Sequence, residues 1–170
     1  MPYDQNQLWK PTRPYILGSG KYAGKALEYV LLQDLPAFLT MKYQLESNIK
    51  EDCKPNEYHR HLMWLVDGIN LLASRVKCSE CDQNALYIPA RGNMAEGYYY
   101  LAYPLCKKCV DSNYEWTRST IFSITPWHFY TNIKKSEQKR IWKVIKIILK
   151  IDHMTSQQLF QLLLSNYGPI

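Results

Sequence analysis

Four of the five cysteines fall into two closely spaced pairs, and this spacing is typical of a metal site. The first pair is Cys78 and Cys81, and the second is Cys106 and Cys109. Two intervening residues let one loop of backbone place both sulfurs on the same ion, and four thiolates form a closed, structural zinc site. A redox CxxC motif is normally a single pair in a βαβ context, whereas these two pairs bracket residues 82–105. The sequence therefore predicts one structural Zn²⁺ ion, with no coordination position open for catalysis.

The residues between the two cysteine pairs carry the signals of a β-hairpin. Residues 85–88 and 98–103 read as strands, and Gly92 with Asn93 supplies turn chemistry between them. The pattern resembles a zinc ribbon or a treble clef, two families that are common among nucleic-acid-handling proteins and that also serve as protein-binding modules. A ribbon continues into a third strand after Cys109, whereas a treble clef starts a helix there. The sequence of this segment favours neither.

Positive charge is concentrated in a second segment. The chain has a net charge of +6, and residues 116–151 hold eight basic side chains and one acidic side chain. Within the helix expected over residues 136–150, four lysines recur at helical spacing and form one stripe opposite a row of isoleucine and valine side chains. Such a stripe is suited to neutralising phosphates. The predicted nucleic-acid-binding residues are Lys21, Lys25, Lys134, Lys135, Lys139, Lys143, Lys146 and Lys150.

Two other interpretations of the lysine stripe stay open. A lysine-rich outer face can simply keep a helix soluble, and it can also bind an acidic protein. Basic amphipathic helices bind anionic membranes as well. We expect no membrane contact here, because the apolar side of the helix is needed for packing against the helix that begins near Thr155.

Gly18, Gly20 and Lys21 do not form a phosphate-binding loop. That motif requires glycine five residues before Gly20, where Tyr15 stands, and serine or threonine after Lys21, where Tyr22 stands. The looser dinucleotide pattern would require a βαβ unit, and none follows. We therefore predict no nucleotide cofactor.

The same glycine-containing segment resembles the small C-terminal domain of exonuclease X-like proteins. Residues 17–28, LGSGKYAGKALE, match its GKYxGKxLE motif, and Asp34 followed by Phe38 and Leu39 stands where the family has an acidic residue and an aromatic–leucine pair. The resemblance covers residues 15–46, and the family's nuclease domain has no counterpart. It implies a nucleic-acid-associated accessory module whose motif residues form a small exposed surface. At least one glycine of the motif is expected at positive φ.

No catalytic constellation is visible, so we predict a non-enzymatic protein. Tyrosines at positions 98, 99, 100 and 103 alternate faces on a strand and could stack on unpaired bases. We interpret the remaining candidates as structural or surface residues: Cys53, His59, His61, His128 and His153.

Helices are expected on both sides of the cysteine segment. Apolar periodicity and breaker residues place them over residues 27–32, 34–46, 55–76 and 136–150, with a last helix from residue 155. Asp34, Ser136 and Thr155 are the expected N-caps, and Thr155 with Gln158 fits a capping box. Residues 110–133 are ambiguous: residues 120–124 could form a strand, and Pro126 interrupts whatever element lies there.

These elements predict an α+β fold that packs into one compact unit with zinc in the middle. Along the chain we expect a glycine-loop hairpin with helices (1–54), a connecting helix (55–77), a four-cysteine zinc-binding β region (78–133), and the basic helix with a C-terminal helix (134–170).

The expected function is that of a zinc-containing accessory protein that binds DNA or RNA. The alternative is a protein–protein adaptor or inhibitor that acts on a nucleic-acid-processing machine. No apolar run is long enough to span a membrane, and the N-terminus lacks the features of a signal peptide, so we expect a cytoplasmic or nucleoid-associated protein.

Overall fold

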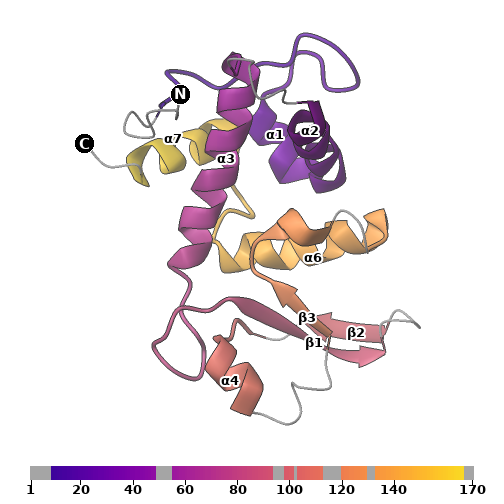
Figure 1. Ribbon diagram of the computed structural model, residues 1–170, viewed down its shortest axis with the longest axis vertical. Helices are drawn as coiled ribbons and strands as arrows, with labels where there is room; N and C mark the ends of the chain where they lie inside the picture. Colours follow the sequence, from indigo (N-terminus) through magenta and orange to yellow (C-terminus); the bar gives the residue numbers. More distant parts are fainter. Residues whose placement is uncertain are drawn as a thin grey trace. The chain divides into compact units, whose positions relative to one another are not determined.

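The computed structural model describes residues 9–48, 55–93, 98–101, 103–112, 120–129 and 133–166 (Figure 1). Helices and a small antiparallel sheet make up the described chain, which confirms the α+β class. The residues group into two compact units where we expected one. The helical unit comprises Met1–Gly68 and Met154–Ile170, and the cysteine unit comprises Ile69–His153. No described helix is both long and apolar enough to cross a membrane.

The helical unit is built from α1 (Leu27–Gln33), α2 (Leu35–Asn48), most of α3 (Glu57–Ser74) and α7 (Ser156–Asn166). Helix α1 packs against both α2 and α7. A Cβ atom at Gly68 of α3 would lie 2.8 Å from Cδ1 of Leu163, so a larger residue there would have to displace this leucine side chain of α7. The fully buried core residues include Leu27, Val30, Leu31, Phe38, Leu39, Leu62, Leu65, Leu159, Phe160 and Leu163.

Side-chain caps fix the starts of three helices in the helical unit. Backbone N of His59 donates to Oδ1 of Asn56 at 2.9 Å ahead of α3. At α7 the expected capping box is confirmed, because the N–H of Thr155 donates to Gln158 Oε1 at 2.8 Å and the N–H of Gln158 donates to Thr155 Oγ1 at 3.3 Å. Asp34 caps α2, as expected, by accepting the backbone N–H of Ala37 at 3.4 Å.

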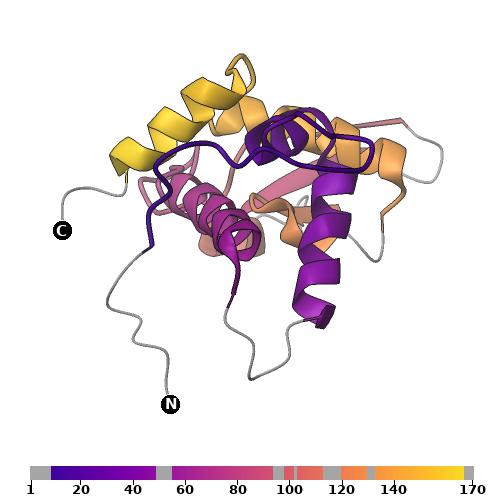
Figure 2. The same ribbon diagram turned by 90° about the horizontal axis from the view of Figure 1, so that it is seen from above.

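A glycine-bounded loop precedes α1 and closes on itself as the sequence predicts (Figure 2). Ile16 and Ala26 form an isolated antiparallel bridge, and the N–H of Leu17 donates to the carbonyl of Lys25 at 2.9 Å. Gly20 and Gly24 have φ values of +78° and +77°, which confirms the expected positive φ.

The cysteine unit contains a three-stranded antiparallel sheet in the order β2-β1-β3. Its strands are β1 (Tyr87–Asn93), β2 (Tyr98–Leu101) and β3 (Thr120–Ser123). Gly92 and Asn93 were expected in a turn, but they lie in β1 opposite Tyr99 and Tyr98. The strand is longer than predicted because the pairing with β2 extends through both residues, and the connection itself lies outside the described residues.

Three short or amphipathic helices complete the cysteine unit: α4 (Lys107–Ser112), the 3₁₀ helix η1 (Pro126–Phe129) and α6 (Lys135–Ile148). Trp127 of η1 donates its Nε1–H to Oδ1 of Asn70 at the end of α3, at 2.6 Å. Helix α6 contacts η1, whereas α7 packs on α1. The two C-terminal helices, which we expected to form a pair, therefore belong to different units.

Helix α6 begins and ends differently from the prediction. Its N-cap is Lys134, so Ser136 lies inside the first turn and is not the cap. The side-chain Nε2 of Gln138 donates to the carbonyl of Ile133, which stabilises this earlier start of the helix. At the other end Ile148 is the last helical residue, and Lys150 adopts a φ of 59°. The N–H of Lys150 bonds the Ile147 carbonyl at 3.0 Å and the N–H of Ile151 bonds the Lys146 carbonyl at 2.9 Å, which is a Schellman ending.

Candidate metal centre and nucleic-acid interface

The four predicted ligand cysteines come together in the cysteine unit. The sulfur atoms of Cys78, Cys81, Cys106 and Cys109 all lie within 4.8 Å of one another. The Sγ atom of Cys81 is 3.6 Å from that of Cys106 and 3.5 Å from that of Cys109. An arrangement of four convergent thiols is able to hold a metal ion.

Hydrogen bonds donated by backbone N–H groups stabilise the two cysteine loops. At the first pair, the N–H of Cys78 donates to the carbonyl of Gln83 at 2.9 Å. Lys77 and Asn84 form an isolated antiparallel β-bridge around this loop. At the second pair, the N–H of Cys109 points at Sγ of Cys106, 3.4 Å away. This hydrogen bond stabilises negative charge on the sulfur, as metal-bound thiolates require.

The two loops are also tied to each other and to the sheet. The N–H of Ser79 donates to the carbonyl of Pro104 at 3.0 Å, and Leu105 pairs with Tyr87 at the start of β1. Leu105 and Val110 are buried against the cysteines, so a small apolar cluster supports the sulfurs from one side. The loops therefore hold the four thiols together through backbone contacts as well as through any metal.

A helix begins directly at the second cysteine pair, and the third strand of the sheet, β3, comes later in the chain. Helix α4 begins at Lys107, and Cys109 is its third residue. The structure thus has both the helix expected of a treble clef and a later third strand, as expected of a ribbon.

The electrostatics of the four thiols favour a bound cation. Burial disfavours the thiolate of Cys78, but backbone N–H groups around it, that of Cys106 foremost, outweigh burial and lower its pKa to about 6. The pKa of Cys109 is raised, mainly by its contact with the sulfur of Cys81 and then by burial. Neighbouring thiols thus compete for negative charge, and a divalent cation would stabilise all four thiolates at once.

Helix α6 presents most of its predicted lysines to solvent. Ile141, Trp142 and Ile145 form its buried side, and Trp142 was not among the expected core residues. Lys146 departs from the expected stripe, because it is half-buried and burial lowers its pKa. The exposed members are Lys134, Lys135, Lys139, Lys143 and Lys150.

These five exposed lysines form no ion pair with any acidic side chain in the described part of the chain. The charge of the whole molecule is also divided unequally. The cysteine unit carries thirteen basic and seven acidic side chains, a net charge of +6, whereas the helical unit carries eight of each and is neutral. All of the excess positive charge therefore lies in the unit that holds the cysteine cluster.

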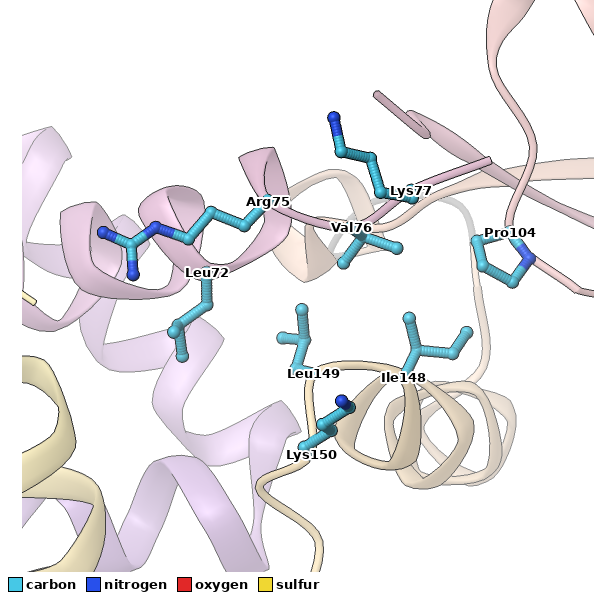
Figure 3. Close-up of a pocket in the computed structure, with 8 residues that line it drawn as sticks. All are labelled: Leu72, Arg75, Val76, Lys77, Pro104, Ile148, Leu149 and Lys150. Carbon is cyan, nitrogen blue, oxygen red and sulfur yellow. The ribbon is translucent and has the colours of Figure 1, made fainter. Parts of the chain in front are cut away.

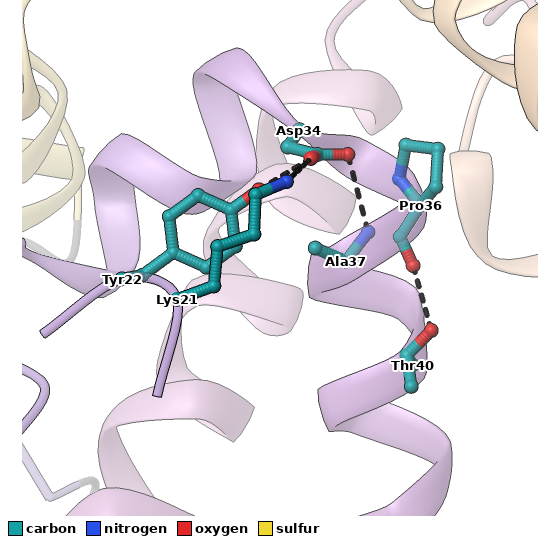
Figure 4. A network of polar contacts seen from close by, with 6 residues as sticks. All are labelled: Lys21, Tyr22, Asp34, Pro36, Ala37 and Thr40. Carbon is teal, nitrogen blue, oxygen red and sulfur yellow. Dashed lines mark hydrogen bonds and ion pairs between the residues drawn. The ribbon is translucent and has the colours of Figure 1, made fainter. Parts of the chain in front are cut away.

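The two lysines of the glycine loop lie in the neutral helical unit and have partners within it. Lys21 Nζ is 3.2 Å from Oδ2 of Asp34, and Lys25 Nζ lies 5.2 Å from the centre of the Tyr29 ring. The hydroxyl of Tyr22 donates to the same Oδ2, while Oδ1 of Asp34 caps α2 (Figure 4). These contacts give the loop a structural role, because they hold the side chain of Asp34 in the position where it caps the N-terminus of α2.

Sequence reasoning missed one buried polar pair. Glu28 is the last residue of the glycine-loop motif, and its Oε1 atom is hydrogen-bonded to Nε2 of His61 at 2.7 Å. Both side chains are buried. The signal was present, because Glu28 stands inside an apolar run and His61 lies four residues before Leu65 on the buried face of α3.

The other candidates have local roles or lie outside the described residues. His153 pairs with Asp152 at 2.7 Å, and the hydroxyl of Tyr103 donates to Glu80 at 3.3 Å. Cys53 and the side chains of His128, Tyr98, Tyr99 and Tyr100 fall outside the described part of the chain.

Comparisons with known proteins bring no relative to this chain. No protein-family model, no curated protein and no solved structure matches it. The function is therefore inferred from the chemistry of the residues and from their arrangement.

Proposed function

We propose that the chain is a zinc-containing, non-enzymatic accessory protein that binds nucleic acid through the exposed lysines of α6. The observation that carries this proposal is the charge of the cysteine unit. It holds the whole net charge of +6, and its five exposed lysines on and beside α6 form no ion pair with described acids. Ammonium groups on and beside one helix that lack acidic partners among the described residues suit a polyanion, whose phosphates can take that place.

The sulfur distances fit a single four-coordinate ion, for which we propose zinc. A tetrahedron with Zn–S bonds of about 2.3 Å has sulfur–sulfur edges of about 3.8 Å. The separations of 3.5 and 3.6 Å and the limit of 4.8 Å for all pairs match a single ion. An iron–sulfur cluster also takes four cysteines, but its iron and sulfide atoms hold the cysteine sulfurs farther apart. Four thiolates around one zinc leave no open position, so the metal supports the fold and takes no part in catalysis.

Phosphate contacts from lysines carry no base information. We therefore expect binding to DNA or RNA with little sequence preference and strong dependence on salt. We base this proposal on the α6 lysines; the glycine-loop lysines Lys21 and Lys25 are also exposed, and they contact Asp34 and Tyr29 in the neutral helical unit.

Fluorescence anisotropy with labelled DNA and RNA oligonucleotides tests the proposal on the zinc-loaded full chain. The double variant Lys139→Glu/Lys143→Glu should weaken binding at low salt by about tenfold or more, because it turns two attractive charges into repulsive ones. The matched control Arg13→Glu/Arg60→Glu makes the same change in net charge at exposed positions of the helical unit. It should leave the affinity nearly unchanged.

If both double variants weaken binding equally, only overall charge matters and the α6 surface has no special role. If wild type binds no nucleic acid at low salt, the adaptor function takes its place. Circular dichroism of each variant shows whether the fold is retained.

A further inference from the structure

A concave apolar surface lies within the cysteine unit, and none of the four clustered cysteines lines it. It has a volume of about 540 Å³, which falls within the range of about 300–1,000 Å³ that ligand pockets occupy. Figure 3 shows aliphatic side chains from three segments facing the same space. They come from the end of α3, from the residue that precedes Leu105, and from the end of α6: Leu72, Val76, Pro104, Ile148 and Leu149.

The remaining lining residues of this pocket are all cationic. Arg75, Lys77 and Lys150 are exposed, and no acidic residue lines the pocket among the described residues. The ammonium of Lys77 donates to Oδ1 of Asn84 at 3.0 Å, and in Figure 3 it points away from the aliphatic side chains, as does the guanidinium of Arg75. The pocket therefore combines an aliphatic floor with a positive border of three cationic residues at its edge, whose charged groups lie outside the floor where a flanking residue of a ligand would be.

Lys150 holds its place in this border at a conformational cost. Its φ of 59° is the left-handed region that the Schellman ending of α6 requires, and glycine or asparagine usually occupies it. A lysine in this position is less favourable for the helix ending than glycine would be. It does place an ammonium group at the pocket, which a glycine could not.

The lining indicates what kind of ligand fits. Single-stranded nucleic acid is held by stacking on aromatic rings, and this pocket has none among its lining residues. An aliphatic floor suits a large apolar side chain, and a cationic border suits carboxylates on either side of it. We propose that the pocket is a docking site for an acidic segment of a partner protein, in which one large apolar side chain is flanked by aspartate or glutamate. This site is separate from the exposed lysines of α6 apart from Lys150.

Methyl NMR on the zinc-loaded full chain tests the proposal with four synthetic peptides. Each peptide has one central apolar residue, Leu, Ile, Phe or Trp, with two acidic residues before it and two after it. In the control for each peptide, Asn and Gln replace Asp and Glu. At least one acidic peptide should shift the methyl signals of Leu72, Val76 and Ile148, and its amide control should bind at least several-fold more weakly.

The variant Lys150→Gly separates binding from folding. It should lower the affinity for the acidic peptide about two- to fivefold, which is the effect of one exposed charge pair. The same substitution should raise the melting temperature of the protein. Lys143→Ala removes an equal charge from the exposed side of α6 and should leave peptide binding unchanged. A structural role alone would not make stability and affinity move in opposite directions.

Three results would overturn the proposal. The first is the absence of pocket methyl shifts with all four acidic peptides at millimolar concentration. The second is equal binding of the amide controls, since the positive border would then have no role. The third is a single-stranded oligonucleotide that shifts the same methyl signals and displaces the peptide, which would assign the pocket to nucleic acid.

Discussion

The Oε1 atom of Glu28 lies 2.7 Å from Nε2 of His61, and the two side chains are 0% and 1% exposed. The pair joins α1 to α3 inside the helical unit. Aromatic rings surround the imidazole: Phe160 stacks on it with an interplanar angle of 2°, and Trp64 lies edge-on at 5.4 Å. Trp9 and Tyr15 complete the enclosure, with centroids 6.2 and 6.1 Å away. A polar pair in such a setting depends on both partners.

Removing one member of this pair should destabilise the helical unit strongly. Glu28→Leu leaves the imidazole, and His61→Phe leaves the carboxyl, buried without its partner, so each should cost about 2–5 kcal/mol of unfolding free energy. The double variant should recover most of that loss, because apolar groups then fill the site. Urea denaturation of the four proteins measures the coupling. Additive losses in the double variant would show that the two side chains act independently.

The contact between Tyr22 and Asp34 predicts a loss of stability at alkaline pH. Burial and then the hydrogen bond to Asp34 raise the pKa of Tyr22 above its ordinary value near 10. The folded state thus holds this proton more tightly than the unfolded state. The stabilisation is complete below about pH 10 and is lost as the pH rises through the folded-state value.

The matched variant for this effect is Tyr22→Phe, which removes the phenol and keeps the ring. At neutral pH it should lower stability by about 1 kcal/mol or less. Above about pH 10 its thermal stability should fall less steeply than that of wild type. If the melting temperatures of the two proteins fall equally as the pH rises from neutral to alkaline, Tyr22 is not the group responsible for the loss of stability.

Lys150 predicts a stabilising substitution. Lys150→Gly should raise the unfolding free energy by about 0.5–1 kcal/mol, because glycine adopts the left-handed conformation without strain. Lys143→Gly is the control, since the same change inside α6 should cost about 1 kcal/mol. Differential scanning calorimetry should therefore show shifts of opposite sign. A lower melting temperature for Lys150→Gly would mean that its side chain, and not its backbone, dominates at this position.

Cysteine variants test the metal site. Elemental analysis of the purified chain should return about one zinc per molecule. Cys106→Ser should abolish stoichiometric zinc and lower stability by more than about 3 kcal/mol, because metal binding and folding are coupled. Cys53→Ser, at the one cysteine outside both pairs, should change neither quantity. Chelation that leaves the melting curve of wild type unaltered would contradict a structural role for the metal.

Local signals in the sequence were sufficient for the metal site and for several caps. The CxxC spacing identified four sulfurs that do converge, because two residues between ligands determine the loop almost alone. The capping box at Thr155 and the cap at Asp34 are also decided by neighbours within four residues. Positive φ at Gly20 and Gly24 followed from glycine's freedom in a tight loop.

Features that depend on distant residues were not predictable in the same way. Helical periodicity showed that α6 and α7 each have an apolar face, but it could not tell that α7 packs on α1. The pairing of Glu28 with His61 depends on how α1 meets α3. The partner of Lys21 and Tyr22 also lies beyond the glycine loop: both side chains contact Asp34, which depends on how the loop meets the end of α1.

The dependence of nucleic-acid affinity on salt tests the central claim most directly. For the zinc-loaded full chain on duplex DNA, the logarithm of the association constant should fall linearly with the logarithm of the KCl concentration. If the five exposed lysines each contact a phosphate, the slope should approach about −4.5, and Lys139→Glu/Lys143→Glu should reduce its magnitude by about 2. A slope near zero, or no binding at about 50 mM salt, would contradict nucleic-acid binding by α6.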